Sequence, residues 1–214
     1  MEITPREAIL KKVRQALLEK TKNPYPDLDL DSPLIKLSDD DPAIEFAANL
    51  KSLGGQFVYC ANKYEYIEHL ITLMEQNSWS KVFCHEEELQ KDLFETGLEI
   101  YQDDKDFEYV EASITSCEAL IYRSGTLLVS NKQQNRKLVS QTPSHIVVAF
   151  ASQLVRDIKD GFLIARNKYG RAVPSWMMLI SGPSRTADIE KTPVQGVHGA
   201  KELYVFLIED RKAA

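Results

Sequence analysis

The sequence has few cysteines and no recognisable motif for a nucleotide or a metal cluster. Its three cysteines, Cys60, Cys84 and Cys117, are far apart and odd in number, which does not suggest a disulfide framework. Their spacing is not that of zinc or iron–sulfur ligands, and neither a P-loop nor a GxGxxG pattern occurs. We therefore expect no metal, cluster or flavin in this chain, and we interpret the cysteines as buried thiols in a reducing cytoplasm.

Long apolar runs and basic clusters are missing as well. No apolar run approaches the roughly 20 residues that a membrane-spanning helix needs. The net charge is −6, which argues against nucleic acid and against an anionic membrane surface as partners. The polar, acidic start of the chain does not resemble a signal peptide. These features predict a cytoplasmic protein, and the hydrophobic content of 43% is enough for a sizeable core.

The N-terminal part is expected to be a helix followed by an extended arm. Thr4-Pro5-Arg6-Glu7 has the residues of a capping box with proline in the first turn, and apolar residues at helical spacing continue to about Lys20. Residues 23–41 contain three prolines and are typical of a linker. We divide the chain into this helix and arm, residues 1–41, and an α/β domain, residues 42–214. The arm could contact a neighbouring subunit and form a homo-oligomer, or it could pack on its own domain.

The rest of the chain alternates between strand and helix patterns. This alternation predicts a three-layer α/β fold with an open, mostly parallel sheet covered on both faces. We expect a helical turn at residues 116–121. Longer helices are expected at residues 42–53, 63–76, 86–95 and 152–166, and strands at residues 56–61, 81–84, 109–115, 126–129, 146–150, 176–180 and 203–208.

The last two expected strands enclose the densest group of glycine, hydroxyl and charged residues. This group is Ser181-Gly182-Pro183-Ser184-Arg185-Thr186-Ala187-Asp188-Ile189-Glu190, followed by Gly196-Val197-His198-Gly199. Proline suits the first position of a helix, so we predict a helix that begins at Pro183 and ends before Pro193. Its first-turn amides would favour an anion, and Arg185 would add a bidentate donor for a carboxylate or phosphate. Alternatively, Arg185 pairs with Asp188 and the serines serve only as caps.

These same residues strongly resemble the lactate-utilisation protein C family, also called the LUD domain. The resemblance is sharp from about Ile114 to the end of the chain and weak before it. One departure is Ala200, where the family pattern has proline. The resemblance implies the NagB/RpiA/CoA-transferase-like fold.

The resemblance extends to two upstream segments. The family has a Thr-Gly-Thr step preceded by an acidic residue, whereas this chain has Ser124-Gly125-Thr126 preceded by Arg123. The reversed charge argues against an acid–base role at Arg123 and favours an anion there. His145 follows Thr142-Pro143-Ser144, at a place where the family also carries histidine.

We expect all these segments to face one crevice at the carboxyl ends of the strands, where open α/β sheets bind their ligands. The predicted ligand-binding residues are Ser124, Gly125, Thr126, Ser181, Gly182, Pro183, Ser184, Arg185, Thr186, Gly196 and Gly199. The candidate catalytic residues are His145, His198 and Asp188.

Three functions follow as hypotheses. The resemblance implies a subunit that works with two iron–sulfur proteins to convert L-lactate to pyruvate, binding a small carboxylate or organising the assembly. A second hypothesis is a stand-alone enzyme of the wider fold that acts on a phosphorylated or carboxylate small molecule. The third is an interaction module in which the motif is a structural corner. Turnover by the isolated chain would favour the second hypothesis.

Overall fold

The computed structural model describes residues 4–18, 40–94, 100–101, 109–132, 136–187 and 193–211, and the chain divides into two compact units, residues 1–38 and 39–214. The described part of the first unit is helix α1 (Pro5–Leu18). It starts at the predicted capping box: the Thr4 N–H donates to Glu7 Oε2 (2.9 Å), and the Glu7 N–H donates to Thr4 Oγ1 (3.3 Å). Among the described residues, no helix is long and apolar enough to span a bilayer. The large apolar side chains of α1 are exposed; these are Ile9, Leu10, Val13, Leu17 and Leu18.

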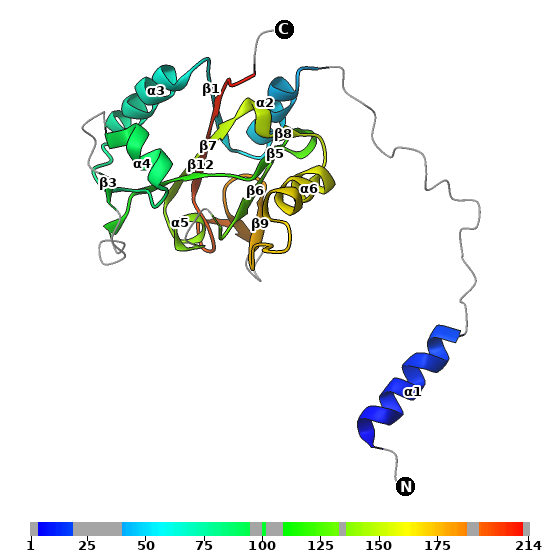
Figure 1. Ribbon diagram of the computed structural model, residues 1–214. Coiled ribbons are helices and arrows are strands. Elements are labelled where there is room, and N and C mark those ends of the chain that lie inside the picture. The colour runs from blue at the N-terminus through cyan, green and yellow to red at the C-terminus, as the bar shows by residue number, and fades with distance from the viewer. Residues whose placement is uncertain are drawn as a thin grey trace. The chain divides into compact units, whose positions relative to one another are not determined.

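The second unit is built on a six-stranded, wholly parallel sheet (Figure 1). The central strands β7 and β12 are almost continuously apolar and buried, as expected for a parallel sheet covered on both faces. This confirms the predicted mostly parallel sheet. The strands, in spatial order, are β1 (Gln56–Cys60), β12 (Glu202–Ile208), β7 (Ser144–Phe150), β4 (Ala112–Ser116), β2 (Val82–Phe83) and β3 (Ile100–Tyr101).

One face of this sheet is covered by helices α3 (Lys63–Gln76) and α4 (Glu87–Phe94) (Figure 1). The sequence predicted both helices. Asn62 caps α3 by accepting the Glu65 N–H at 3.0 Å. Their buried side chains pack on one side of the strands and form the first core; these are Tyr66, Leu70, Met74, Leu89 and Leu93.

The opposite face is covered by α2 (Pro42–Ser52), α5 (Arg136–Ser140) and a second sheet of four strands. Asp41 caps α2 by accepting the Ala43 N–H at 2.8 Å, and Pro42 occupies the first turn, as predicted. The second sheet was not anticipated. Its strands, in spatial order, are β8 (Leu154–Val155), β5 (Ala119–Ile121), β6 (Thr126–Ser130) and β9 (Met177–Ile180).

Two predicted elements were wrong because of this second sheet. The helical turn expected at residues 116–121 is not formed: Ser116 ends β4, and residues 119–121 are strand β5, paired with β6. The helix expected from Ser152 starts later, as α6 (Ile158–Tyr169), after a 3-10 turn and β8. Its buried residues are Gly161 and Ala165, whereas Phe162 and Leu163 are exposed.

All three cysteines are free and buried, as predicted from their sequence contexts. Burial raises the pKa of Cys60 to about 11 and that of Cys84 to about 12, and it also raises the pKa of Cys117. Thiols with such pKa values are inert at neutral pH, which fits a role in packing.

A buried carboxylate ties the second sheet to α6. The Glu118 side chain is fully buried and accepts hydrogen bonds from the Ser130 hydroxyl (2.5 Å) and the Tyr169 hydroxyl (2.7 Å). The Lys168 ammonium lies 3.0 Å from its other oxygen. The carboxylate therefore links the start of β5, the end of β6 and the end of α6.

We predict that Glu118→Ala lowers the free energy of unfolding by about 3 kcal/mol, because the buried Ser130 hydroxyl loses its charged acceptor. Glu209→Ala is the control: Glu209 pairs with Arg211 (2.7 Å) at a site where the Arg211 side chain is 41% exposed, so its loss should cost less than about 1 kcal/mol. Urea unfolding of both variants measures the difference. Equal losses would show that Glu118 does not hold the two elements together.

Candidate functional site

The described part of the glycine- and hydroxyl-rich motif does not form the helix predicted to begin at Pro183. Residues Arg185–Ala187 are strand β10, which pairs antiparallel with β11 (Pro193–Gln195). The Ser184 N–H donates to the Ala200 carbonyl (2.8 Å), and the Gly196 N–H donates to the Ser184 carbonyl (3.1 Å). The backbone is thus paired across the motif instead of along a helix, and no first-turn amides are available for an anion.

The motif also lies at the opposite edge of the main sheet from the one predicted. Ser181 follows β9, which belongs to the second sheet, where β9 runs antiparallel to β6. His145 is the second residue of β7, and Gly199 lies just before β12, so both are at the amino-terminal edge of the parallel strands. The expectation of a motif crevice at the carboxyl ends was therefore wrong.

At this amino-terminal edge, part of the motif surrounds a hollow of about 210 Å³. We call it the motif hollow. It brings together His145 and His198, which are 53 positions apart in the sequence. His145 is 1% exposed, whereas His198 is exposed to solvent. The predicted site residues that line the motif hollow are His145, Gly182, Pro183, Ser184, Arg185, His198 and Gly199.

Arg185 is the lining residue best suited to an anion. A β-carbon added at Gly54 would lie 2.4 Å from Arg185 Nη2, so the guanidinium rests against the backbone turn that ends α2. The carbonyl groups at the end of a helix favour a cation. Arg185 is itself exposed and can also meet an anion that enters from solvent.

His145 is a buried, uncharged residue in the lining of the motif hollow. Its Nε2 atom lies 2.7 Å from the Thr115 hydroxyl on the adjacent strand β4. Burial lowers the pKa of His145 to about 4, since the imidazolium would lose its hydration. At neutral pH the ring therefore carries no charge and can act as a hydrogen-bonding or proton-accepting group.

The Ser124-Gly125-Thr126 step supports the motif without lining the hollow. Thr126 Oγ1 and Ser181 Oγ are 2.8 Å apart, and the Ser124 hydroxyl donates to Thr126 Oγ1 at 2.9 Å. Gly125 has a φ of +60°, and a β-carbon there would lie 2.4 Å from the Leu50 backbone nitrogen. Only glycine allows α2 to approach the step so closely.

Arg123, where the family has an acidic residue, is occupied by an ion pair. Its Nε donates to Asp157 Oδ1 at 2.6 Å, at the start of α6. The guanidinium therefore anchors α6, and the expectation that it favours an anionic ligand is not supported by its placement.

Three further predicted residues, Ser181, Thr186 and Gly196, do not line the hollow. Thr186 donates weakly to the Val194 carbonyl within the hairpin (3.4 Å), and Gly196 makes the turn after β11. Asp188 lies outside the described residues, so its predicted catalytic role stays a prediction. Within the described ranges, no group of three His, Cys, Asp or Glu side chains is placed to hold a metal ion.

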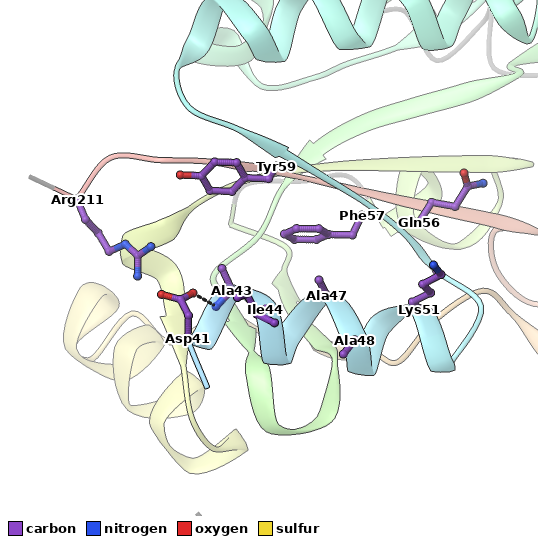
Figure 2. A pocket seen from close by; sticks show the side chains of 11 residues that line it. Asp41, Ala43, Ile44, Ala47, Ala48, Lys51, Gln56, Phe57, Tyr59 and Arg211 are labelled. Atoms are coloured by element: carbon purple, nitrogen blue, oxygen red, sulfur yellow. Dashed lines mark hydrogen bonds between the residues drawn. The ribbon is translucent and has the colours of Figure 1, made fainter. Parts of the chain in front are cut away.

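A larger hollow of about 920 Å³ lies elsewhere, between α2 and the edge strand β1. Figure 2 shows Phe57 over α2, with Asp41 and Arg211 at one end and Lys51 at the other. None of the predicted site residues lines it. Between these charged ends, its walls are alanine, isoleucine and aromatic side chains, which provide apolar contact.

Comparisons with known proteins agree with these features. A family model described as the LUD domain matches residues 44–208. Lactate utilization protein C of Deinococcus radiodurans is 31% identical over 121 residues, or 52% of this chain and 55% of that protein. Lactate utilization protein C of Bacillus subtilis is 33% identical over 110 residues, or 50% of this chain and 46% of that protein. The chain thus spans about half the length of the curated relatives it matches.

A solved structure shares the fold. The crystal structure of a DUF162 family protein from Deinococcus radiodurans superposes with a TM-score of 0.60 at 17% identity, covering 81% of this chain and 99% of that chain. This likeness confirms the mixed α/β fold.

The buried His145 predicts a specific loss of stability in acid. Its pKa falls from an ordinary 6.5 to about 4 on folding, so the unfolded chain binds the extra proton between these values. Stability from this group is complete above pH 6.5 and falls by about 1.4 kcal/mol per pH unit towards pH 4. The stability advantage of the wild type over His145→Asn should therefore shrink across this window in denaturant unfolding. His69→Asn, which changes a histidine that folding leaves exposed, is the control for the substitution itself. A constant difference for His145→Asn would contradict the neutral, buried assignment.

Proposed function

The chain belongs to the LUD domain family, and we propose that it takes part in lactate utilisation with partner proteins that carry iron–sulfur clusters. The observation that carries the proposal is the family match over most of the second unit, together with relatives named lactate utilization protein C.

We further propose that the motif hollow binds a small inorganic anion, for which phosphate is the probe. Arg185 would meet the anion with its planar guanidinium. The exposed His198 would add a second donor from the loop before β12, and neutral His145 would form part of the lining. The size of the hollow, about 210 Å³, suits a ligand of only a few heavy atoms. Anion binding here would occur at the amino-terminal edge of the main sheet.

Redox chemistry is assigned to the partners in this proposal. The thiols of Cys60, Cys84 and Cys117 are buried and have raised pKa values, so they are poor cluster ligands. The chain would then bind the organic acid or organise the assembly, while electrons from lactate pass to clusters in other subunits.

The anion proposal is tested by thermal unfolding of the full chain with phosphate. A ligand at about ten times its Kd adds about 1.4 kcal/mol, which is a rise of about 3–5 °C for a domain of this size. Arg185→Ala should abolish the rise and keep the melting temperature without ligand within a few degrees. Arg171→Ala removes another exposed arginine, outside the hollow, and should keep the rise. An undiminished rise in Arg185→Ala would rule out the motif hollow as the anion site.

The assignment of redox chemistry to the partner proteins is tested by lactate-dependent dye reduction. The purified chain alone should reduce no dye, and activity should appear when the iron–sulfur partner proteins are added. Iron bound stoichiometrically to the purified chain, or lactate oxidation by it alone, would move the redox chemistry into this subunit.

A further inference from the structure

The chain path defines a second place where a ligand can bind. After β2 and β1 the chain crosses the main sheet over the face covered by α3 and α4. After β4 and β7 it crosses over the other face, through the second sheet and its helices. Strands β2 and β4 are neighbours, so their outgoing connections separate to opposite faces. Open α/β sheets bind ligands outside the carboxyl ends of the strands at such a switch point.

The structure has a pocket of about 350 Å³ at this point. We call it the switch-point pocket. Four strands contribute to it from their carboxyl ends: Lys63 follows β1, Glu86 follows β2, Ser116 ends β4, and Phe150 ends β7. It lies at the opposite edge of the sheet from the motif hollow and shares no lining residue with it.

Glu86 is the central polar group of this pocket. The Ser116 N–H donates to Glu86 Oε1 at 2.6 Å, and the Ser116 hydroxyl donates to Glu86 Oε2 at 2.5 Å. These two bonds fix the carboxylate across the gap between β2 and β4. Each carboxylate oxygen can accept two hydrogen bonds, so one position on each is available for a donor from a ligand. Burial raises the pKa of Glu86, as is common for carboxyl groups at functional sites.

The other walls of the pocket differ in chemistry. Val148 is buried and Phe150 half-buried, and together they form an apolar wall on the side covered by α3 and α4. The Lys63 ammonium lies at the rim, 2.8 Å from Asp92, and its side chain is 57% exposed. Lys91, Glu88 and Asp92 also line the pocket. The two lysine ammonium groups can meet an anionic group, so a ligand that fits this arrangement has a hydroxyl donor, an anionic group and an apolar part.

We propose that the switch-point pocket binds a 2-hydroxy acid. The hydroxyl donates to Glu86, the carboxylate meets the Lys63 ammonium, and the substituent on the carbon chain lies against Phe150 and Val148. This placement rests on the proposed function for its choice of ligand class. It separates the organic acid from the small anion of the motif hollow.

The test is isothermal titration of the full chain with 2-hydroxy-3-phenylpropanoate, whose ring suits the apolar wall. The matched compound is 3-phenylpropanoate, which lacks only the hydroxyl. It should bind about tenfold or more weakly, because the hydrogen bond to a charged acceptor is lost. Glu86→Gln and Lys63→Met should each weaken the hydroxy acid about tenfold or more. Glu86→Gln keeps an acceptor for Ser116, and circular dichroism checks its fold. Lys63→Met also removes the ion pair with Asp92, so circular dichroism checks its fold as well.

Arg185→Ala separates the two sites, since it should leave hydroxy-acid binding unchanged. If Arg185→Ala loses the thermal shift with phosphate but keeps the hydroxy acid, both proposals stand. If it keeps both, only the motif-hollow proposal fails. Three results would overturn the switch-point proposal. The first is hydroxy-acid binding that is lost in Arg185→Ala but kept in Glu86→Gln and Lys63→Met. The others are equal affinity of the wild type for the two compounds, and no binding of the hydroxy acid to the wild type at millimolar concentration.

Discussion

The burial of a parallel sheet on both faces is the constraint on which the second unit depends. Strands β7 and β12 present apolar side chains to both sides, so each face must be covered. Helices α3 and α4 cover one face, and α2 with a second sheet covers the other (Figure 1). Crossover connections between parallel strands are right-handed. Connections that lead to strands on opposite sides of a given position therefore run over opposite faces of the sheet. The connections that leave β2 and β4 separate to opposite faces for this reason.

The two edges of the main sheet consequently have different chemistry. At the amino-terminal edge, the loop after β9 and the loop before β12 meet over His145, and an exposed arginine and histidine lie around a small hollow. At the carboxyl edge, a buried glutamate spans two strands beside an apolar wall. The first edge suits a small anion held by positive donors, and the second suits an organic acid held by its hydroxyl. The family match covers both edges, because it extends over residues 44–208.

The sequence predicted most elements of the main sheet and its helices, and it missed how the motif is connected to them. Capping residues such as Asp41 and Asn62 marked helix starts correctly because caps are local interactions. The apolar run before Ser181 was recognised as a strand, but periodicity cannot show that β9 belongs to a second sheet. Because β9 belongs to the second sheet, the motif that follows it lies at the amino-terminal edge of the main sheet. Gly182-Pro183 was interpreted as a helix start, whereas pairing with residues near Gly196 and Ala200 determines a hairpin. Glu86 carried no local signal, since its partner Ser116 is 30 positions away.

The central claim is that the switch between β2 and β4 creates the binding place for the organic acid. Backbone amide chemical shifts of the full chain during titration with a 2-hydroxy acid test it most directly, because each amide reports on its own surroundings. The account predicts the largest shifts at Glu86, Ser116 and Phe150–Gln153, with little change in the motif. Shifts confined to residues 182–185 and 198–199 would contradict it.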